Sequence, residues 1–165
     1  MFTIKKATAV AAAALAVSGA VAAAAPASAD VRAVSQNVRF FNENTGGSLD
    51  ANGLGGNVAL SWTPNGTAYQ DWFLDAGSQG GVQIRSRARN QCLQAPENAG
   101  DQIAVVDCNK YIPTQWWVLN EVNGRYAIAL QRDQERVIES VPTGNPVFLG
   151  FFDGNENQVW DVNPS

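Results

Sequence analysis

The sequence contains no histidine, only two cysteines, and charged residues at just 16% of its 165 positions. The lack of histidine excludes catalytic triads and metal sites that depend on imidazole. Two cysteines are too few for a tetrathiolate zinc site or an iron–sulfur cubane. The net charge of −4 disfavours nucleic acid as a partner, because phosphates are bound by clustered lysines and arginines. The length is typical of one domain.

Residues 1–29 have the pattern of a secretory signal peptide. Lys5 and Lys6 precede a long alanine-rich apolar run, and small residues at 27–29 form a cleavage-type site. A membrane anchor is the alternative, but alanine is weakly apolar and the run ends at that site. We therefore expect export, with residues 30–165 forming one secreted, extracellular domain that does not insert into a membrane.

Three features recur with a period of about 44 residues, which indicates an internal repeat. Each repeat has a leucine-type residue near its start, an alternating apolar triplet in its middle and a Gln-x-Trp signature at its end. The leucine-type residues are Leu49, Leu93 and Ile138, and the triplets are 58–60, 103–105 and 147–149. The signatures are Gln70-Asp71-Trp72, Gln115-Trp116-Trp117 and Gln158-Val159-Trp160.

Local patterns within the repeats favour β-strands. Val38 and Phe40 alternate with Arg39 and Phe41, and apolar and polar residues alternate in 82–85. Turn clusters such as Asn52-Gly53 and Asn65-Gly66 separate the short runs. Sustained helical spacing is missing after the leader. We expect an all-β fold of about twelve short strands. The approximate repeats are 38–80, 81–124 and 125–165.

This arrangement resembles the ricin-type β-trefoil, or QxW, family of lectins and carbohydrate-binding modules. The resemblance covers residues 38–163, and the middle repeat carries it best, from Cys92-Leu93 through Val106-Asp107-Cys108 to Gln115-Trp116-Trp117. It implies a six-stranded barrel capped by three hairpins with pseudo-threefold symmetry.

The resemblance also assigns structural roles. Cys92 and Cys108 occupy the family's intra-repeat disulfide positions; a reactive thiol pair is the alternative, and it is disfavoured in an oxidising compartment. The signature tryptophans are expected to anchor the core, since tryptophan buries a large apolar area. The signature glutamines are expected mainly to satisfy backbone groups, with a minor role at the edge of a sugar site. The core tryptophans are Trp72, Trp117 and Trp160.

A sugar pocket of this family combines a carboxylate, an aromatic ring and an Asn-Gln pair. In repeat one the carboxylate is Asp50 and the glutamine is Gln70, while Tyr69 replaces the asparagine. The ring position aligns with Ser61, and a shift of one residue brings in Trp62. An alternative interpretation is that Asp50 only stabilises a turn before Asn52-Gly53.

Repeat three offers Glu139 as the carboxylate, Phe151 or Phe152 as the ring, and the complete pair Asn157-Gln158. The alternatives are that Glu139 is a solvated charge and that both phenylalanines are core. Repeat two has Gln94, Val106 and Thr114 at these positions, so its pocket is expected to be lost.

The sequence offers nothing that favours catalysis, because its carboxylates are scattered in turns and small trefoils lack the cleft of a glycosidase. We expect a protein without enzyme activity, cofactor or metal. The favoured hypothesis is a secreted carbohydrate-binding protein that recognises neutral sugars or a polysaccharide through repeats one and three. The alternative is a degenerate trefoil that binds a protein, as an inhibitor or as a subunit of an adhesin or toxin.

Overall fold

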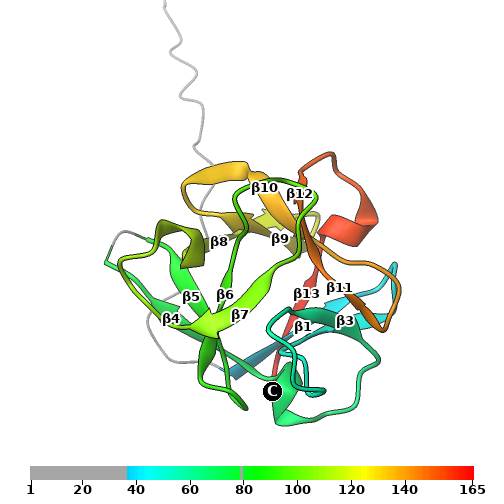
Figure 1. The fold of residues 1–165 in the computed structure, drawn as a ribbon. Coiled ribbons are helices and arrows are strands. Elements are labelled where there is room, and N and C mark those ends of the chain that lie inside the picture. The colour runs from blue at the N-terminus through cyan, green and yellow to red at the C-terminus, as the bar shows by residue number, and fades with distance from the viewer. Residues whose placement is uncertain (1–36, 79) are drawn as a thin grey trace, which may run out of the picture.

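The computed structural model describes residues 37–78 and 80–165, so the expected signal peptide lies outside the described residues. Within these ranges the chain forms thirteen short strands and three 3-10 helices, arranged as three similar units (Figure 1). None of the helices in the described part has the length and apolar character needed to span a membrane.

The three repeats share a succession of three strands, a 3-10 helix and a further strand, and repeat three has one additional short strand, β11. Repeat one comprises β1 (Asn37–Asn42), β2 (Gly47–Asp50), β3 (Leu60–Trp62), η1 (Ala68–Gln70) and β4 (Trp72–Ala76). Repeat two comprises β5 (Val82–Ser86), β6 (Gln91–Gln94), β7 (Ala104–Asp107), η2 (Pro113–Gln115) and β8 (Trp117–Val122). Repeat three comprises β9 (Arg125–Leu130), β10 (Asp133–Glu139), β11 (Asn145–Pro146), β12 (Phe148–Phe151), η3 (Glu156–Gln158) and β13 (Asp161–Pro164).

Strand pairing closes six of these strands into a barrel. Antiparallel pairs run from β13 to β1, then to β4, β5, β8 and β9. A bridge between Tyr126 in β9 and Trp160, just before β13, closes the circle. The pairs β2–β3, β6–β7 and β10–β12 form the three hairpins that cap it. This is the expected β-trefoil.

The three caps meet in a ring of backbone hydrogen bonds with threefold symmetry. The amide of Ala59 donates to the carbonyl of Ile103, Ile103 donates to Val147, and Val147 donates back to Ala59, at 2.9, 3.0 and 3.0 Å. All three residues are fully buried. Each apolar triplet supplies one residue to this junction, the second residue of the triplet in repeat one and the first in repeats two and three.

The signature tryptophans lie in the core and repeat one contact. Trp72, Trp117 and Trp160 are fully buried, and each indole N–H donates to the backbone carbonyl of its own repeat's leucine-type residue. Burying an indole without a partner for this donor would be costly, so the tryptophan and leucine-type positions depend on each other.

The signature glutamines close a loop in each repeat. Each side-chain amide donates to the backbone carbonyl of a residue seven or eight positions upstream, and each side-chain oxygen accepts a backbone N–H two residues after that carbonyl. All three glutamines are buried. The loops satisfied in this way run from Thr63 to Gln70, from Asp107 to Gln115 and from Phe151 to Gln158.

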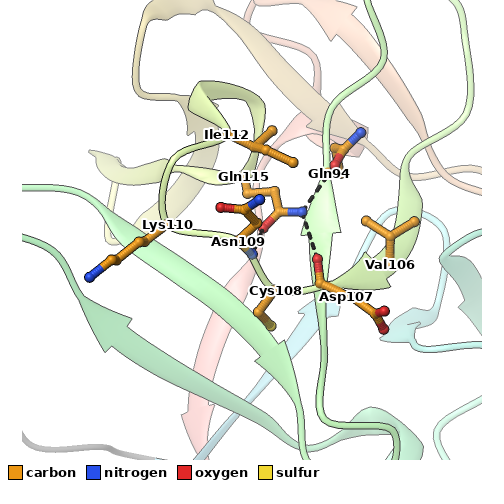
Figure 2. A pocket seen from close by; sticks show the side chains of 8 residues that line it. All are labelled: Gln94, Val106, Asp107, Cys108, Asn109, Lys110, Ile112 and Gln115. Atoms are coloured by element: carbon orange, nitrogen blue, oxygen red, sulfur yellow. Dashed lines mark hydrogen bonds between the residues drawn. The ribbon is translucent and has the colours of Figure 1, made fainter.

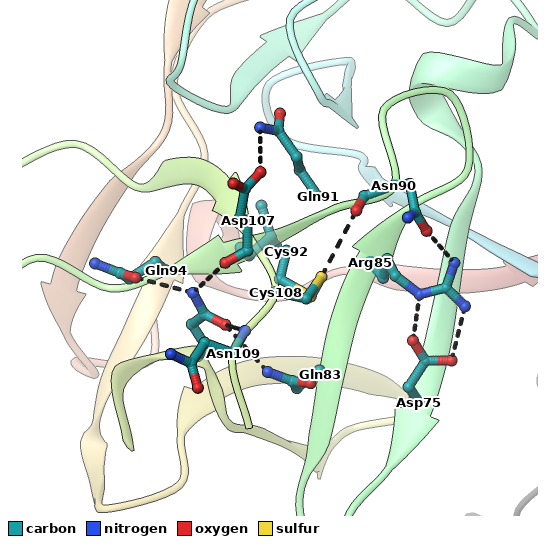
Figure 3. The surroundings of a disulfide bond; sticks show 12 residues. Asp75, Gln83, Arg85, Asn90, Gln91, Cys92, Gln94, Asp107, Cys108 and Asn109 are labelled. Atoms are coloured by element: carbon teal, nitrogen blue, oxygen red, sulfur yellow. Dashed lines mark hydrogen bonds and ion pairs between the residues drawn. A yellow bond between two sulfur atoms is a disulfide. The ribbon is translucent and has the colours of Figure 1, made fainter. Parts of the chain in front are cut away.

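A disulfide reinforces repeat two alone. Cys92 and Cys108 are bonded, with their Cα atoms 4.9 Å apart, and the described residues contain no free cysteine. The bridge holds the segment of Asp107 and Asn109 against β6 (Figure 3). The expected pairing is therefore confirmed.

Candidate functional site

The three capping hairpins carry corresponding side chains on the faces that point away from the core. In repeat two, Leu93 and Val105 oppose each other and are buried in the core. Because side chains alternate along a strand, the neighbouring positions face outward. By register, the outer positions are Asp50, Leu60 and Trp62 in repeat one, Gln94, Ala104 and Val106 in repeat two, and Glu139, Phe148 and Gly150 in repeat three.

Repeat three gathers a carboxylate and two amides. The side-chain amide of Asn157 donates to Oε1 of Glu139 at 2.9 Å, and that of Gln158 donates to Oε2 at 3.3 Å. Asn157 also donates to the backbone carbonyl of Ser140 at 3.3 Å. Both protons of the Asn157 amide are therefore used on the protein, and the carboxylate is held by one contact on each oxygen. The geometry orients Glu139 and leaves lone pairs on both oxygens as acceptors.

The aromatic side chain nearest the carboxylate of repeat three is not the one expected from the sequence. Gly150 occupies the register position of Trp62, and a Cβ placed on it would overlap the Glu139 carboxylate. Phe148 pairs directly with Glu139 and shares its face, whereas Phe151 pairs with Arg136 on the other face.

Neither of the two phenylalanines proposed from the sequence lies in the core. Phe151 is 63% exposed and Phe152 is 41% exposed. The alternative that both are core residues is wrong. The register favours Phe148, a residue that sequence reasoning used only as part of the apolar triplet. Its alternation with the buried Leu149 was the available signal.

Repeat one has the ring but a different carboxylate environment. Trp62 pairs with Ser48 and shares the outer face with Asp50, while Ser61 is fully buried and faces the core. The strand register therefore places Trp62, and not Ser61, at the ring position, as the one-residue shift predicts. Asp50 is itself buried, and its Oδ1 accepts the backbone N–H of Gly53 at 3.2 Å. The carboxylate thus stabilises the turn, as the alternative interpretation held.

The amides of repeat one do not reproduce the arrangement of repeat three. Tyr69 occupies the position of Asn157, and its ring packs near Gly53. The Gln70 amide donates to the carbonyl of Thr63 at 3.0 Å, and its oxygen accepts the N–H of Asn65 at 3.0 Å. In repeat one, therefore, the glutamine serves its loop.

Repeat two contains a pocket of about 620 Å³, although its sugar site was expected to be lost. Gln94 and Val106 line it together with the loop that follows β7 (Figure 2). The Gln115 amide donates to Gln94 Oε1 and to the carbonyl of Asp107, both at 3.0 Å. Gln94 is thus held by the signature glutamine, as Glu139 is in repeat three. Gln94, however, is a neutral amide where repeat three has a charged carboxylate, and Val106 stands at the position expected for an aromatic ring.

Residues 37–78 and 80–165 contain no group of three or more His, Cys, Asp or Glu side chains placed to hold a metal ion.

Comparison with known proteins agrees with the trefoil fold. The family model for the ricin-type beta-trefoil lectin domain matches residues 36–160, so the chain belongs to this family. A search of curated proteins found no match.

Solved structures share the fold at low sequence identity. The C-terminal half of an earthworm R-type lectin, solved with GalNAc, has a TM-score of 0.63 and 21% identity, over 79% of this chain and 99% of that one. A ricin B-like lectin from Macrolepiota procera, solved with lactose, has a TM-score of 0.67 and 16% identity, over 79% and 96%. An exo-beta-1,3-galactanase from Clostridium thermocellum has a TM-score of 0.69 and 21% identity, over 81% of this chain but 31% of the enzyme.

Proposed function

We propose that the protein is a secreted lectin that binds neutral sugar units of a glycan, mainly through the outer face of repeat three and secondarily through repeat one. Family membership supports sugar binding in general, and the earthworm and Macrolepiota relatives were solved with GalNAc and lactose. The leader-like sequence of residues 1–29 supports export.

The observation that carries the proposal is the cluster of Glu139, Asn157 and Gln158. Adjacent hydroxyls of a pyranose need acceptors in fixed positions, and the two amides fix both carboxylate oxygens. With both amide protons of Asn157 engaged, its Oδ1 is an additional acceptor for a sugar hydroxyl. Hydrogen bonds to a charged acceptor contribute about 1.5–3 kcal/mol each, more than those between neutral groups.

The apolar partner in repeat three is Phe148, which is partly buried and directly opposite Glu139. A ring beside the carboxylate contacts the C–H face of a pyranose while the carboxylate holds its hydroxyls. Gly150 keeps the space above Glu139 open, because any side chain there would overlap the carboxylate. Phe152 follows directly after the same strand, is exposed, and is the second candidate ring.

Repeat one is the secondary site. Trp62 supplies a ring on the same face as Asp50, but Asp50 is already engaged by Gly53 and no Asn-Gln pair flanks it. A neutral sugar would therefore gain more from stacking on Trp62 than from the carboxylate.

Binding, rather than catalysis, is the proposed activity. The galactanase relative shows that this fold also occurs within enzymes, but this chain spans only 31% of that protein. A shallow site with one charged acceptor and one ring predicts a dissociation constant on the order of 0.1–1 mM, about 4–5.5 kcal/mol.

A glycan array followed by titration of the best neutral glycan tests the proposal. We expect Glu139→Gln to weaken binding by about tenfold or more, since the substitution keeps the shape but removes the charge. Gln94→Ala, at the corresponding position of repeat two, is the matched control and should leave the affinity unchanged. If no glycan binds at millimolar concentration, the proposal is wrong and protein recognition replaces it.

A further inference from the structure

A second hollow lies between repeats two and three and shares only Lys110 with the repeat-two pocket. It has a volume of about 390 Å³ and is lined by Lys110, Tyr111, Pro113, Trp116, Gln131 and Arg132. Its lining includes two cations and two aromatic rings but no acidic residue. This composition is unusual in a chain with 15 acidic and 11 basic residues.

The two cations differ from every other basic residue that the structure describes. Elsewhere in 37–78 and 80–165, each arginine donates to a carboxylate or a backbone carbonyl. Hydrogen bonds to Asp75 and Glu156 raise the pKa of Arg85 and that of Arg125. Within the same ranges, only Lys110 and Arg132 have no acidic or carbonyl partner, and both line this hollow.

The hollow is built on fixed backbone. The Trp116 indole N–H donates to the carbonyl of Lys110 at 3.0 Å, which holds the loop carrying Lys110 and Tyr111. The carbonyl of Trp116 accepts the backbone N–H of Gln131 at 2.9 Å, which holds the turn carrying Arg132. The Trp116 ring lies against Gly77, where a Cβ would overlap it. One tryptophan thus positions both sides of the hollow.

The aromatic ring of Tyr111 is presented to solvent. It is 80% exposed, and the Lys110 ammonium lies 5.2 Å from its centre. Lys110 also belongs to the residues that line the repeat-two pocket, but Figure 2 shows its side chain extending away from Gln94 and Val106. The cation is therefore directed away from the family-type position.

We propose that this hollow binds the carboxylate-bearing sugar of an acidic glycan, a hexuronate residue, with Lys110 and Arg132 on the carboxylate and Tyr111 against the sugar ring. A carboxylate fits the unpaired cations, because Arg and Lys donate charge-assisted hydrogen bonds to it. An exposed aromatic ring fits the apolar face of a pyranose and would add little for a small inorganic anion.

The choice of a saccharide over other anions rests on the proposed lectin function, while the site itself is separate. The protein would hold neutral units on its hairpins and an acidic unit here, so its ligand would be a mixed polysaccharide. The proposed neutral-sugar sites of repeats one and three and this hollow have no side chain in common.

The test uses trigalacturonate as the probe and its methyl ester as a neutral ligand of matched shape. The readout is the indole N–H resonance of Trp116 in the ¹⁵N-labelled protein. We expect the acid to shift this signal, and Lys110→Gln and Arg132→Gln to weaken its binding by about fivefold each. Arg87→Gln removes an equal charge elsewhere, where the arginine is paired with Asp71, and should change nothing. High salt should weaken binding of the acid.

Three results would overturn the proposal. They are equal binding of acid and ester, equal weakening by Arg87→Gln, and an equal Trp116 shift with sulfate at the same concentration, which would indicate a general anion site. Glu139→Gln separates this proposal from the lectin hypothesis: it should weaken neutral-glycan binding by about tenfold or more and leave trigalacturonate binding at Trp116 intact. If the wild-type protein binds trigalacturonate but no neutral glycan, the lectin hypothesis is contradicted and this proposal is not.

Discussion

The inner frame of this trefoil and the outer faces of its hairpins follow different rules. The inner frame consists of the signature tryptophans, the signature glutamines and the ring of Ala59, Ile103 and Val147, and its contacts occur three times with the same donors and acceptors. The outer faces carry Asp50 with Trp62, Gln94 with Val106, and Glu139 with Gly150. Threefold sequence similarity therefore reports on stability, and the departures from it report on binding.

The outer faces of repeats one and three also complement each other. Repeat one has the large ring at the register position of the family pocket, but its carboxylate is buried in a turn. Repeat three has the carboxylate held by two amides, but glycine at the ring position. Each of these two repeats therefore has only part of the family's combination of carboxylate, aromatic ring and Asn-Gln pair.

The largest effect is expected in the inner frame. Trp117→Ala should reduce the free energy of unfolding by about 3–5 kcal/mol, because it empties a fully buried site and removes the hydrogen bond from the indole to the Leu93 carbonyl. Urea denaturation measures this. Trp116→Ala is the adjacent control, and it should cost much less, since Trp116 is only partly buried. Equal losses would contradict the separation of frame from surface.

Removing the disulfide should have the next largest effect. A double Cys92→Ser, Cys108→Ser variant should unfold with about 3 kcal/mol less free energy, because the bridge closes a loop with a sequence separation of 16. Calorimetry compares the two proteins, and glycan binding by repeat three should survive at temperatures where the variant remains folded. A loss of binding under those conditions would show that the frame and the outer site are not independent.

The choice of ring in repeat three sharpens the comparison further. Phe148→Ala should weaken neutral-glycan binding by about 0.5–1.5 kcal/mol, because this ring shares the face of Glu139. Phe151→Ala removes an equal ring from the opposite face and should leave the affinity unchanged. Titration calorimetry distinguishes them, and a larger loss for Phe151 would restore the assignment made from the sequence.

Asp50 gives the smallest effect and separates its two roles. Asp50→Ala should lower the free energy of unfolding by about 1 kcal/mol, since it removes the acceptor for the Gly53 N–H. Asp50→Asn retains an oxygen for that contact and should be close to wild type in stability. If Asp50→Asn nevertheless weakens glycan binding, the carboxylate also serves a sugar; an unchanged affinity would assign Asp50 to the turn alone.

The inner frame could be predicted from the sequence because its demands recur. A buried indole needs a carbonyl partner, so tryptophan and leucine-type residues repeat in phase, and the cysteine pair falls in one repeat. The outer sites could be predicted only in part. Glu139 and Asn157-Gln158 came from the family pattern, and the structure brings them into contact.

The missed features depend on register and on contacts between repeats. A shift of one residue decides whether Ser61 or Trp62 faces outward, and whether Phe148 or Phe151 shares the face of Glu139; alignment by signature spacing is too coarse for that. The hollow of Lys110 and Arg132 joins a loop of repeat two to a turn of repeat three, and no periodic pattern records such a junction.

The most direct test of the central claim compares two proteins on one glycan array. The wild-type protein should bind a set of glycans with neutral terminal or internal sugars. A double Trp62→Ala, Glu139→Ala variant, which removes the ring of repeat one and the carboxylate of repeat three, should bind none of these neutral glycans, while its circular dichroism and cooperative unfolding show an intact trefoil. Equal binding by a folded double variant, or no binding by the wild-type protein, would contradict the account.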